Sequence, residues 1–68
     1  EYKLAYDCFT KAIELKADFA EAYYNRATVW FQLPANTYQN TDGCADIKKA
    51  KELGFKVKDE KLKEFGCL

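Results

Sequence analysis

"KAIELKADFAEAYYNRA" (Lys11–Ala27) contains no proline, no glycine and no turn dipeptide, and the fold depends on whether it belongs to one helix or to two. Apolar side chains recur at spacings of three and four from Ala5 to Trp30, as they do along one face of a helix. A single helix over 2–33 would fit this pattern. It would be about three times the average length and would need a coiled-coil partner.

A capping signal favours two helices. Asp18 precedes Glu21 by three residues, which is the spacing of a capping box at a helix N-terminus. An Asp at the N-cap accepts hydrogen bonds from backbone N–H groups that the start of a helix leaves unpaired. We therefore expect Asp18 to cap a second helix.

A degenerate internal repeat points to the same boundary. "KAIEL" (Lys11–Leu15) recurs as "KAKEL" (Lys49–Leu53) at an offset of 38 residues, and Gly54 follows the second copy. Glycine is the favoured residue just past a helix end. If the second copy ends a helix, the first copy ends one as well, and the stretch predicts a turn near 16–18.

The remaining residues extend this pattern to an all-α chain. Pro34 ends the second helix, Thr41 or Asp42 can cap the third, and Asp59 can cap a short fourth one. No segment alternates with period two, so we expect no strand. The predicted helices cover 2–15, 19–33, 43–53 and 59–65.

Composition indicates one small domain with a core. Of the 68 residues, 49% are hydrophobic, and they include five Phe, five Tyr and one Trp. Eleven basic residues balance eleven acidic ones, so no net field attracts nucleic acid or an anionic membrane. No apolar run approaches the roughly 18 residues of a membrane span.

The three cysteines allow two interpretations. Cys8, Cys44 and Cys67 are widely spaced and odd in number, and the chain has no His, which argues against a zinc site and a disulfide framework. Buried free thiols are the favoured interpretation, since free Cys packs as a small apolar side chain. A Cys44–Cys67 disulfide is the alternative. The compartment stays undetermined, although free thiols favour the cytoplasm.

Several of these residues carry a resemblance to a known family. Tyr23, Ala27 and Trp30 in "AEAYYNRATVWFQL" follow an aromatic–small–aromatic pattern. Small–large–small sets occur at Ala5, Phe9 and Ala12 and at Gly43, Ile47 and Ala50. This pattern resembles the tetratricopeptide repeat, a family that stacks antiparallel helix pairs with a period of about 34 residues.

The resemblance implies a right-handed solenoid, and this chain would contain three parts of it. Residues 1–17 would be the second helix of a preceding repeat, 18–54 a complete repeat, and 55–68 a C-terminal capping helix. The chain departs from the family pattern in two ways. Ala17 replaces the usual proline between repeats, and the longer offset implies an enlarged loop at 34–42.

The resemblance also implies a function and a site. Tetratricopeptide proteins hold a peptide or a partner's helix in a groove lined by the first helix of each pair, so we expect a protein-interaction scaffold. Asn25 matches an asparagine that some members use to bond a peptide backbone. The expected groove residues are Glu21, Tyr24, Asn25, Thr28, Phe31 and Gln32.

The first helix would lack its antiparallel mate in this arrangement. The chain begins at Glu1 and has no Met, so we expect further repeats before it. Alternatively, two copies could pair as a homo-oligomer through the unpaired face. That face would consist of Tyr2, Tyr6, Phe9 and Ile13.

The sequence offers little for catalysis. No His is present to activate a cysteine, the glycines are isolated, and we expect no enzymatic activity, cofactor or metal. The seven lysines of 48–63 could contact an acidic partner, although a run without interleaved arginines or exposed aromatics is a poor nucleic-acid reader. The alternative function is structural: capping or self-association of a longer solenoid with no ligand site of its own.

Overall fold

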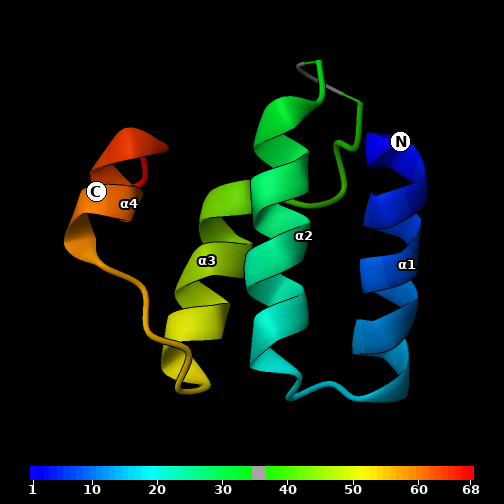
Figure 1. Cartoon of the computed structure of the whole chain (residues 1–68), viewed down its shortest axis with the longest axis horizontal. Coiled ribbons are helices and arrows are strands. Elements are labelled where there is room, and N and C mark those ends of the chain that lie inside the picture. The colour runs from blue at the N-terminus through cyan, green and yellow to red at the C-terminus, as the bar shows by residue number, and fades with distance from the viewer. Residues whose placement is uncertain (35–36) are drawn as a thin grey trace.

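The computed structural model describes residues 1–34 and 37–68, and these residues form helices and turns without a strand. The helices α1, α2 and α3 lie side by side in alternating directions with α2 in the middle, and α4 lies beyond α3 (Figure 1). The predicted all-α class is confirmed, and each predicted helix end lies within one residue of the observed one. The helices are α1 (Tyr2–Leu15), α2 (Ala20–Gln32), α3 (Gly43–Glu52) and α4 (Asp59–Glu64).

The turn between α1 and α2 lies where the repeat predicted it, but its cap differs. The N-cap of α2 is Phe19, which makes no side-chain cap hydrogen bond, so the prediction that Asp18 caps this helix is wrong. The turn is closed instead by the Phe19 N–H, which donates to the Lys16 carbonyl over 3.1 Å. This turn leaves Asp18 one residue before the cap, where its carboxylate makes no cap hydrogen bond.

Helix α3 begins and ends as its sequence predicts. The Asp42 carboxylate accepts the Cys44 backbone N–H over 2.9 Å, which confirms the predicted cap. At the other end Gly54 adopts a left-handed φ of 103°. The N–H of Phe55 donates to the Ala50 carbonyl and that of Gly54 to the Lys51 carbonyl, the two bonds of a Schellman motif.

Helix α4 ends in a second Schellman motif. Gly66 has a φ of 74°, and the Cys67 N–H donates to the Leu62 carbonyl over 2.7 Å. The start of α4 differs from the prediction: Lys58 is the N-cap, and Asp59 is already inside the first turn. There the negative charge of the Asp59 carboxylate interacts favourably with the helix dipole, but the side chain does not cap the helix.

Close approach of α2 and α3 depends on a glycine. A Cβ atom at Gly43 would lie 2.7 Å from the Phe31 ring and 2.8 Å from the Trp30 ring. Such distances are far below van der Waals contact, so the small residue at this position of the repeat pattern has a packing reason. The buried core of the molecule contains Ala27, Ile47 and Leu62.

The segment after α2 folds back onto α1. Residues 35–36 of the expected enlarged loop lie outside the described residues. The Tyr38 ring stacks on Tyr6 with centroids 3.7 Å apart, its hydroxyl donates to Asp7, and its carbonyl accepts the Trp30 indole N–H. Tyr6 also hydrogen-bonds to Thr41.

These contacts correct the predicted face of the first helix. Tyr6 is only 3% exposed, because Tyr38 covers it within the same chain, and it is therefore not part of a free surface. Tyr2 is exposed, whereas Phe9 and Ile13 are half-buried. The most exposed apolar side chains of α1 are Leu4 and Leu15.

Candidate functional site

Four of the six expected groove residues lie on one outward stripe of α2. Their spacing of four, three and four residues places them on the same face of the helix. We call this surface the polar stripe: Glu21, Asn25, Thr28 and Gln32. Glu21 and Gln32 are exposed, and the two residues between them are half-buried.

The polar groups in the middle of the stripe differ in their bonding. The Thr28 hydroxyl donates to the Asn25 carbonyl over 2.8 Å, so it is used within the helix. Among the described residues the Asn25 carboxamide has no hydrogen-bond partner. A half-buried amide with both donors and its acceptor available can bond the backbone of an extended peptide.

The other two expected residues lie beside the stripe and are covered by the end of the chain. Tyr24 stacks on Phe55 with centroids 4.7 Å apart. Phe31 stacks on Phe65 at 4.6 Å with the rings 3° from parallel. The structure therefore separates the predicted groove into the polar stripe and an aromatic border that residues 55–68, hereafter the C-terminal segment, already contact.

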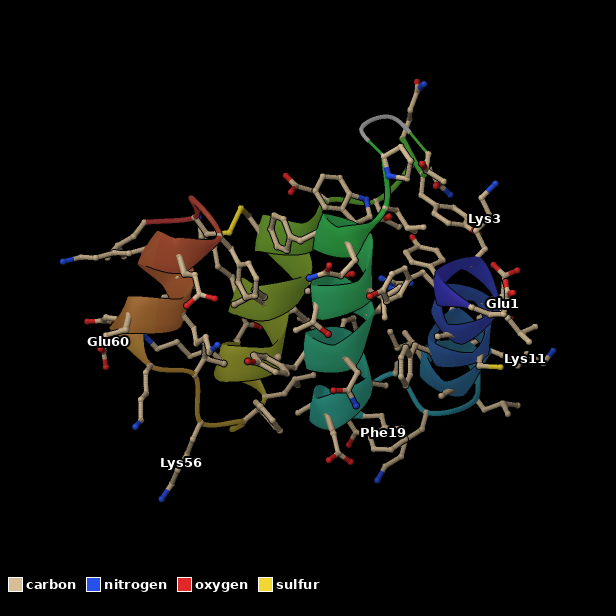
Figure 2. The ribbon with its side chains drawn as sticks, turned by 45° about the horizontal axis from the view of Figure 1, so that its top comes forward. Glu1, Lys3, Lys11, Phe19, Lys56 and Glu60 are labelled. Atoms are coloured by element: carbon tan, nitrogen blue, oxygen red, sulfur yellow. A yellow bond between two sulfur atoms is a disulfide. The ribbon has the colours of Figure 1, made fainter. Side chains whose placement is uncertain are left out.

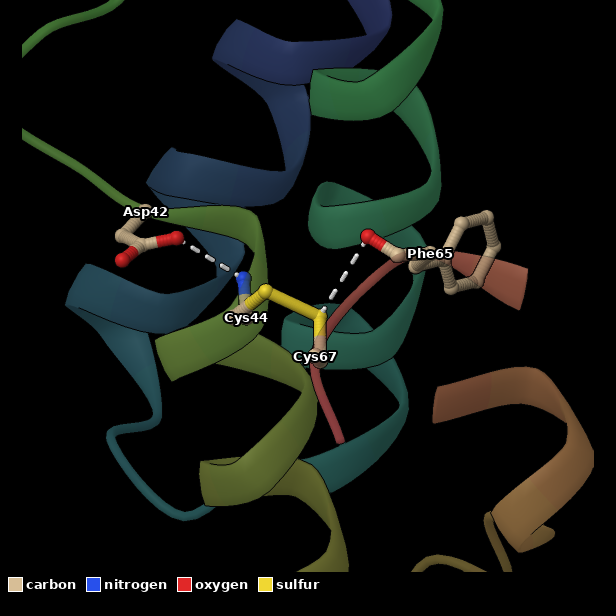
Figure 3. Close-up of a disulfide and its surroundings, with 4 residues drawn as sticks. All are labelled: Asp42, Cys44, Phe65 and Cys67. Atoms are coloured by element: carbon tan, nitrogen blue, oxygen red, sulfur yellow. Dashed lines mark hydrogen bonds between the residues drawn. A yellow bond between two sulfur atoms is a disulfide. The ribbon is translucent and has the colours of Figure 1, made fainter. Parts of the chain in front are cut away.

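A disulfide fastens the C-terminal segment. Cys67 is bonded to Cys44 at the start of α3, with the Cα atoms 5.3 Å apart (Figure 3). The turn at Gly66 brings Cys67 back to α3, within the Cα separation that disulfides require.

The expectation of buried free thiols is therefore wrong. Cys8 is free but exposed, and the alternative pairing of Cys44 with Cys67 is confirmed. Because two of the three cysteines form a disulfide, free thiols no longer favour a cytoplasmic location. In "FGC" (Phe65–Cys67) a helix-ending glycine stands directly before the cysteine, which indicates a change of chain direction at Cys67 but not its partner.

Arg26, the neighbour of Asn25 in sequence, points into the molecule. Its Nε and a terminal nitrogen each donate to the Asp46 carboxylate over 2.8 Å, and the two side chains are 11% and 9% exposed. A further nitrogen donates to the Thr10 hydroxyl. The hydrogen bonds to Asp46 raise the pKa of Arg26 above its ordinary value, against the opposing effect of burial. Arg26 therefore joins α1, α2 and α3 and cannot contact a ligand on the stripe.

The lysine-rich part of the chain forms exposed ion pairs. Lys49 lies 3.4 Å from Glu52, Lys51 lies 3.7 Å from Asp59, and Lys61 lies 3.5 Å from Glu64. Side chains such as Lys56 and Glu60 point away from the helices (Figure 2). These neighbouring acids offset part of the positive charge that an acidic partner would use.

Over residues 1–34 and 37–68, no three His, Cys, Asp or Glu side chains gather closely enough to hold a metal ion. In the same residues no helix has the length and apolar character needed to cross a membrane.

Comparison of the chain with protein-family models, with curated proteins and with solved structures finds no match in any of the three. These comparisons therefore do not identify the chain as a tetratricopeptide-repeat protein.

Proposed function

We propose that this chain is a tetratricopeptide-type interaction module that binds a peptide or a helix of a partner protein along the polar stripe of α2. The observation that carries the proposal is the unpaired Asn25 amide, half-buried in the centre of an outward helix face. Side chains held by a rigid helix lose little freedom on binding, which favours recognition.

The surroundings of the stripe support peptide binding. Tyr24 and Phe31 lie next to it and stack on Phe55 and Phe65, so the stripe is bordered on one side by packed aromatic rings. The helix that carries the stripe is fixed from behind by the buried Arg26–Asp46 pair. Such an arrangement presents a partner with a preformed surface.

A selection of binders tests this function. Peptides would be selected from a random phage-displayed library on the oxidised chain and then measured against Asn25→Ala/Gln32→Ala. We expect the double variant to weaken their binding by about tenfold or more, as truncation of central interface residues does. Circular dichroism would check that its helicity is unchanged.

The matched control removes two exposed side chains from other helices, Lys11→Ala and Lys48→Ala. It should leave peptide affinity unchanged. Selected peptides that bind wild type and the stripe variant equally well would refute the stripe as the binding site.

A second candidate function is self-association through the outer face of α1. Leu4 is 63% exposed and Leu15 is 78% exposed, and both lie on the same side of the helix. Under this proposal Leu4→Glu/Leu15→Glu would shift the sedimentation of the chain from dimer to monomer. The stripe variant would sediment like wild type.

A further inference from the structure

The C-terminal segment covers an apolar surface of α2 and α3 that adjoins the polar stripe. Leu62 is 4% exposed and packs against Ala27 and Ile47, while the Phe65 ring lies parallel to Phe31. Phe55 stacks on Tyr24 at the other end. We call the surface beneath the segment the inner groove: Tyr24, Ala27, Phe31 and Ile47.

The fastening of this segment is unusual for a helix of its size. Helix α4 has six residues, and helices far below about 12 residues do not persist in water without tertiary contacts. The segment is joined to α3 through Gly54 at one end and through the Cys44–Cys67 disulfide at the other. Both cysteines are half-buried, so the bond lies outside the fully buried core.

The remaining helices are joined by contacts of a different kind. The polar contacts between α1, α2 and α3 use residues between Tyr6 and Asp46, and the Arg26–Asp46 pair is their centre. None of these contacts involves a residue of the C-terminal segment. We therefore expect the three longer helices to stay folded when the segment leaves Ala27 and Ile47 uncovered.

We propose that the C-terminal segment is a disulfide-locked latch, and that reduction of Cys44–Cys67 opens the inner groove to a partner helix with the pattern Asp-x-x-Leu-x-x-Phe. This proposal goes beyond the proposed role of the polar stripe, because it names a second binding surface with its own redox control and partner class. The pattern is that of the present occupant: Asp59, Leu62 and Phe65 follow one another at intervals of three along α4 and its C-cap.

Each element of the pattern has a contact in the groove. The leucine fills the position between Ala27 and Ile47, and the phenylalanine stacks on Phe31. The aspartate contacts Lys51, as Asp59 does at 3.7 Å. A partner helix longer than α4 also carries more of its own helical stability, which allows it to displace the tethered segment.

The opening step is a thiol–disulfide exchange with a dithiol reductant. One thiolate of the reductant attacks a sulfur of the Cys44–Cys67 bond, which breaks as a mixed disulfide forms. The second thiolate of the reductant then releases the other cysteine. The reductant leaves as a disulfide, and Cys44 and Cys67 gain two electrons and two protons.

A labelled peptide tests the latch. The probe is a fluorescent peptide of residues 55–68 carrying Cys67→Ser, and the target is the full chain carrying Cys8→Ser, either oxidised or reduced with dithiothreitol. We expect the reduced target to bind the probe about tenfold more tightly or better, because affinity scales with the open fraction. A target carrying Cys44→Ser and Cys67→Ser should behave as the reduced chain does without any reductant.

The control peptide carries Leu62→Ala and Phe65→Ala in addition, and it should not bind either target. Equal binding of the probe to oxidised and reduced chains would overturn the proposal. So would loss of most of the helical circular dichroism on reduction, because the disulfide would then hold the whole fold together. A shift to dimers in sedimentation on reduction would also overturn it, since the segments would then exchange between copies.

The stripe variant separates this inference from the proposed function. Asn25→Ala/Gln32→Ala should leave binding of the probe unchanged, because these residues lie outside the inner groove. If the probe fails while selected peptides still depend on the stripe, only the latch is refuted. If the probe binds and the stripe variant has no effect on selected peptides, only the stripe is refuted.

Discussion

The two sides of α2 are held by different kinds of interaction. Toward α1 and the start of α3, the contacts are mainly polar: the buried Arg26–Asp46 pair, its part-buried bond to Thr10, and the more exposed contacts of Tyr38. Toward the C-terminal segment, they are two aromatic stacks, a buried leucine and a disulfide.

This difference has consequences for how each side responds. A buried ion pair fixes a single arrangement of its helices, because any shift leaves a charge without its partner. Aromatic and aliphatic contacts tolerate exchange, because another apolar side chain of similar size can replace the first. The polar side therefore suits a permanent frame, and the side of the C-terminal segment suits a replaceable contact.

The largest effect is expected from breaking the ion pair. Asp46→Ala leaves the Arg26 guanidinium buried without its carboxylate, which should reduce the free energy of unfolding by about 3–5 kcal/mol. Urea unfolding followed by circular dichroism measures this loss. In a domain of this size the variant would be largely unfolded.

The matched control is Asp59→Ala, which removes an exposed carboxylate from the other side of α2. Asp59 lies 3.7 Å from Lys51 with a 72% exposed side chain, so its loss should change stability by less than about 1 kcal/mol. Replacing the whole pair with Arg26→Met/Asp46→Leu should restore most of the stability. An Asp46→Ala variant as stable as the control would show that the polar side is not the frame.

The sequence predicted the helices better than their connections. Helix ranges follow from apolar spacing, Pro34 and the repeated "KAIEL", all of which act over a few residues. Asp42 was a correct cap, whereas Asp18 failed because the adjacent turn used its neighbours. Local sequence signals therefore predicted the helix ranges, because these ranges depend on residues a few positions apart.

The candidate site was predicted only in part, since its surroundings depend on distant residues. The residues near Tyr6 in the sequence do not indicate that Tyr38 covers it, because the two tyrosines are 32 positions apart. The partner of Arg26 lies 20 residues away. Phe31 was expected in the groove, but the sequence did not indicate that Phe65 would stack on it.

A second prediction concerns Gly43, where the two sides of α2 meet. Gly43→Ala would place a methyl group against Phe31, which stacks on Phe65, and against Trp30, which donates to the Tyr38 carbonyl. Overpacking of this kind should cost about 1–3 kcal/mol in urea unfolding.

A second substitution shows which side of α2 can repack around the added methyl group. Gly43→Ala/Phe31→Leu removes the clashing ring and should recover part of the loss, because the aromatic stack can repack. Gly54→Ala is the control for backbone strain: its Cβ meets nothing within 4 Å, and any cost comes from its φ of 103° alone. If the double variant were no more stable than Gly43→Ala, the stack would be as rigid as the polar side.

The smallest effect is expected from pH, and it should be confined to the polar side. Burial and the hydrogen bond to Asp7 raise the pKa of Tyr38 above its ordinary value of 10.0. A raised pKa means that the neutral phenol is favoured in the folded chain. Its contribution to stability is therefore complete below pH 10.0 and is lost as the pH rises through the folded pKa.

Tyr38→Phe should remove a late step from the tyrosine titration followed by absorbance at 295 nm. The same variant should make stability less dependent on pH above 10.0, because the phenol that loses its contact is gone. The stack of Phe31 on Phe65 contains no ionisable group, so amide exchange in α4 should not follow this titration. Opening of α4 in step with Tyr38 ionisation would mean that the two sides of α2 are coupled, and the latch could then not open independently of the frame.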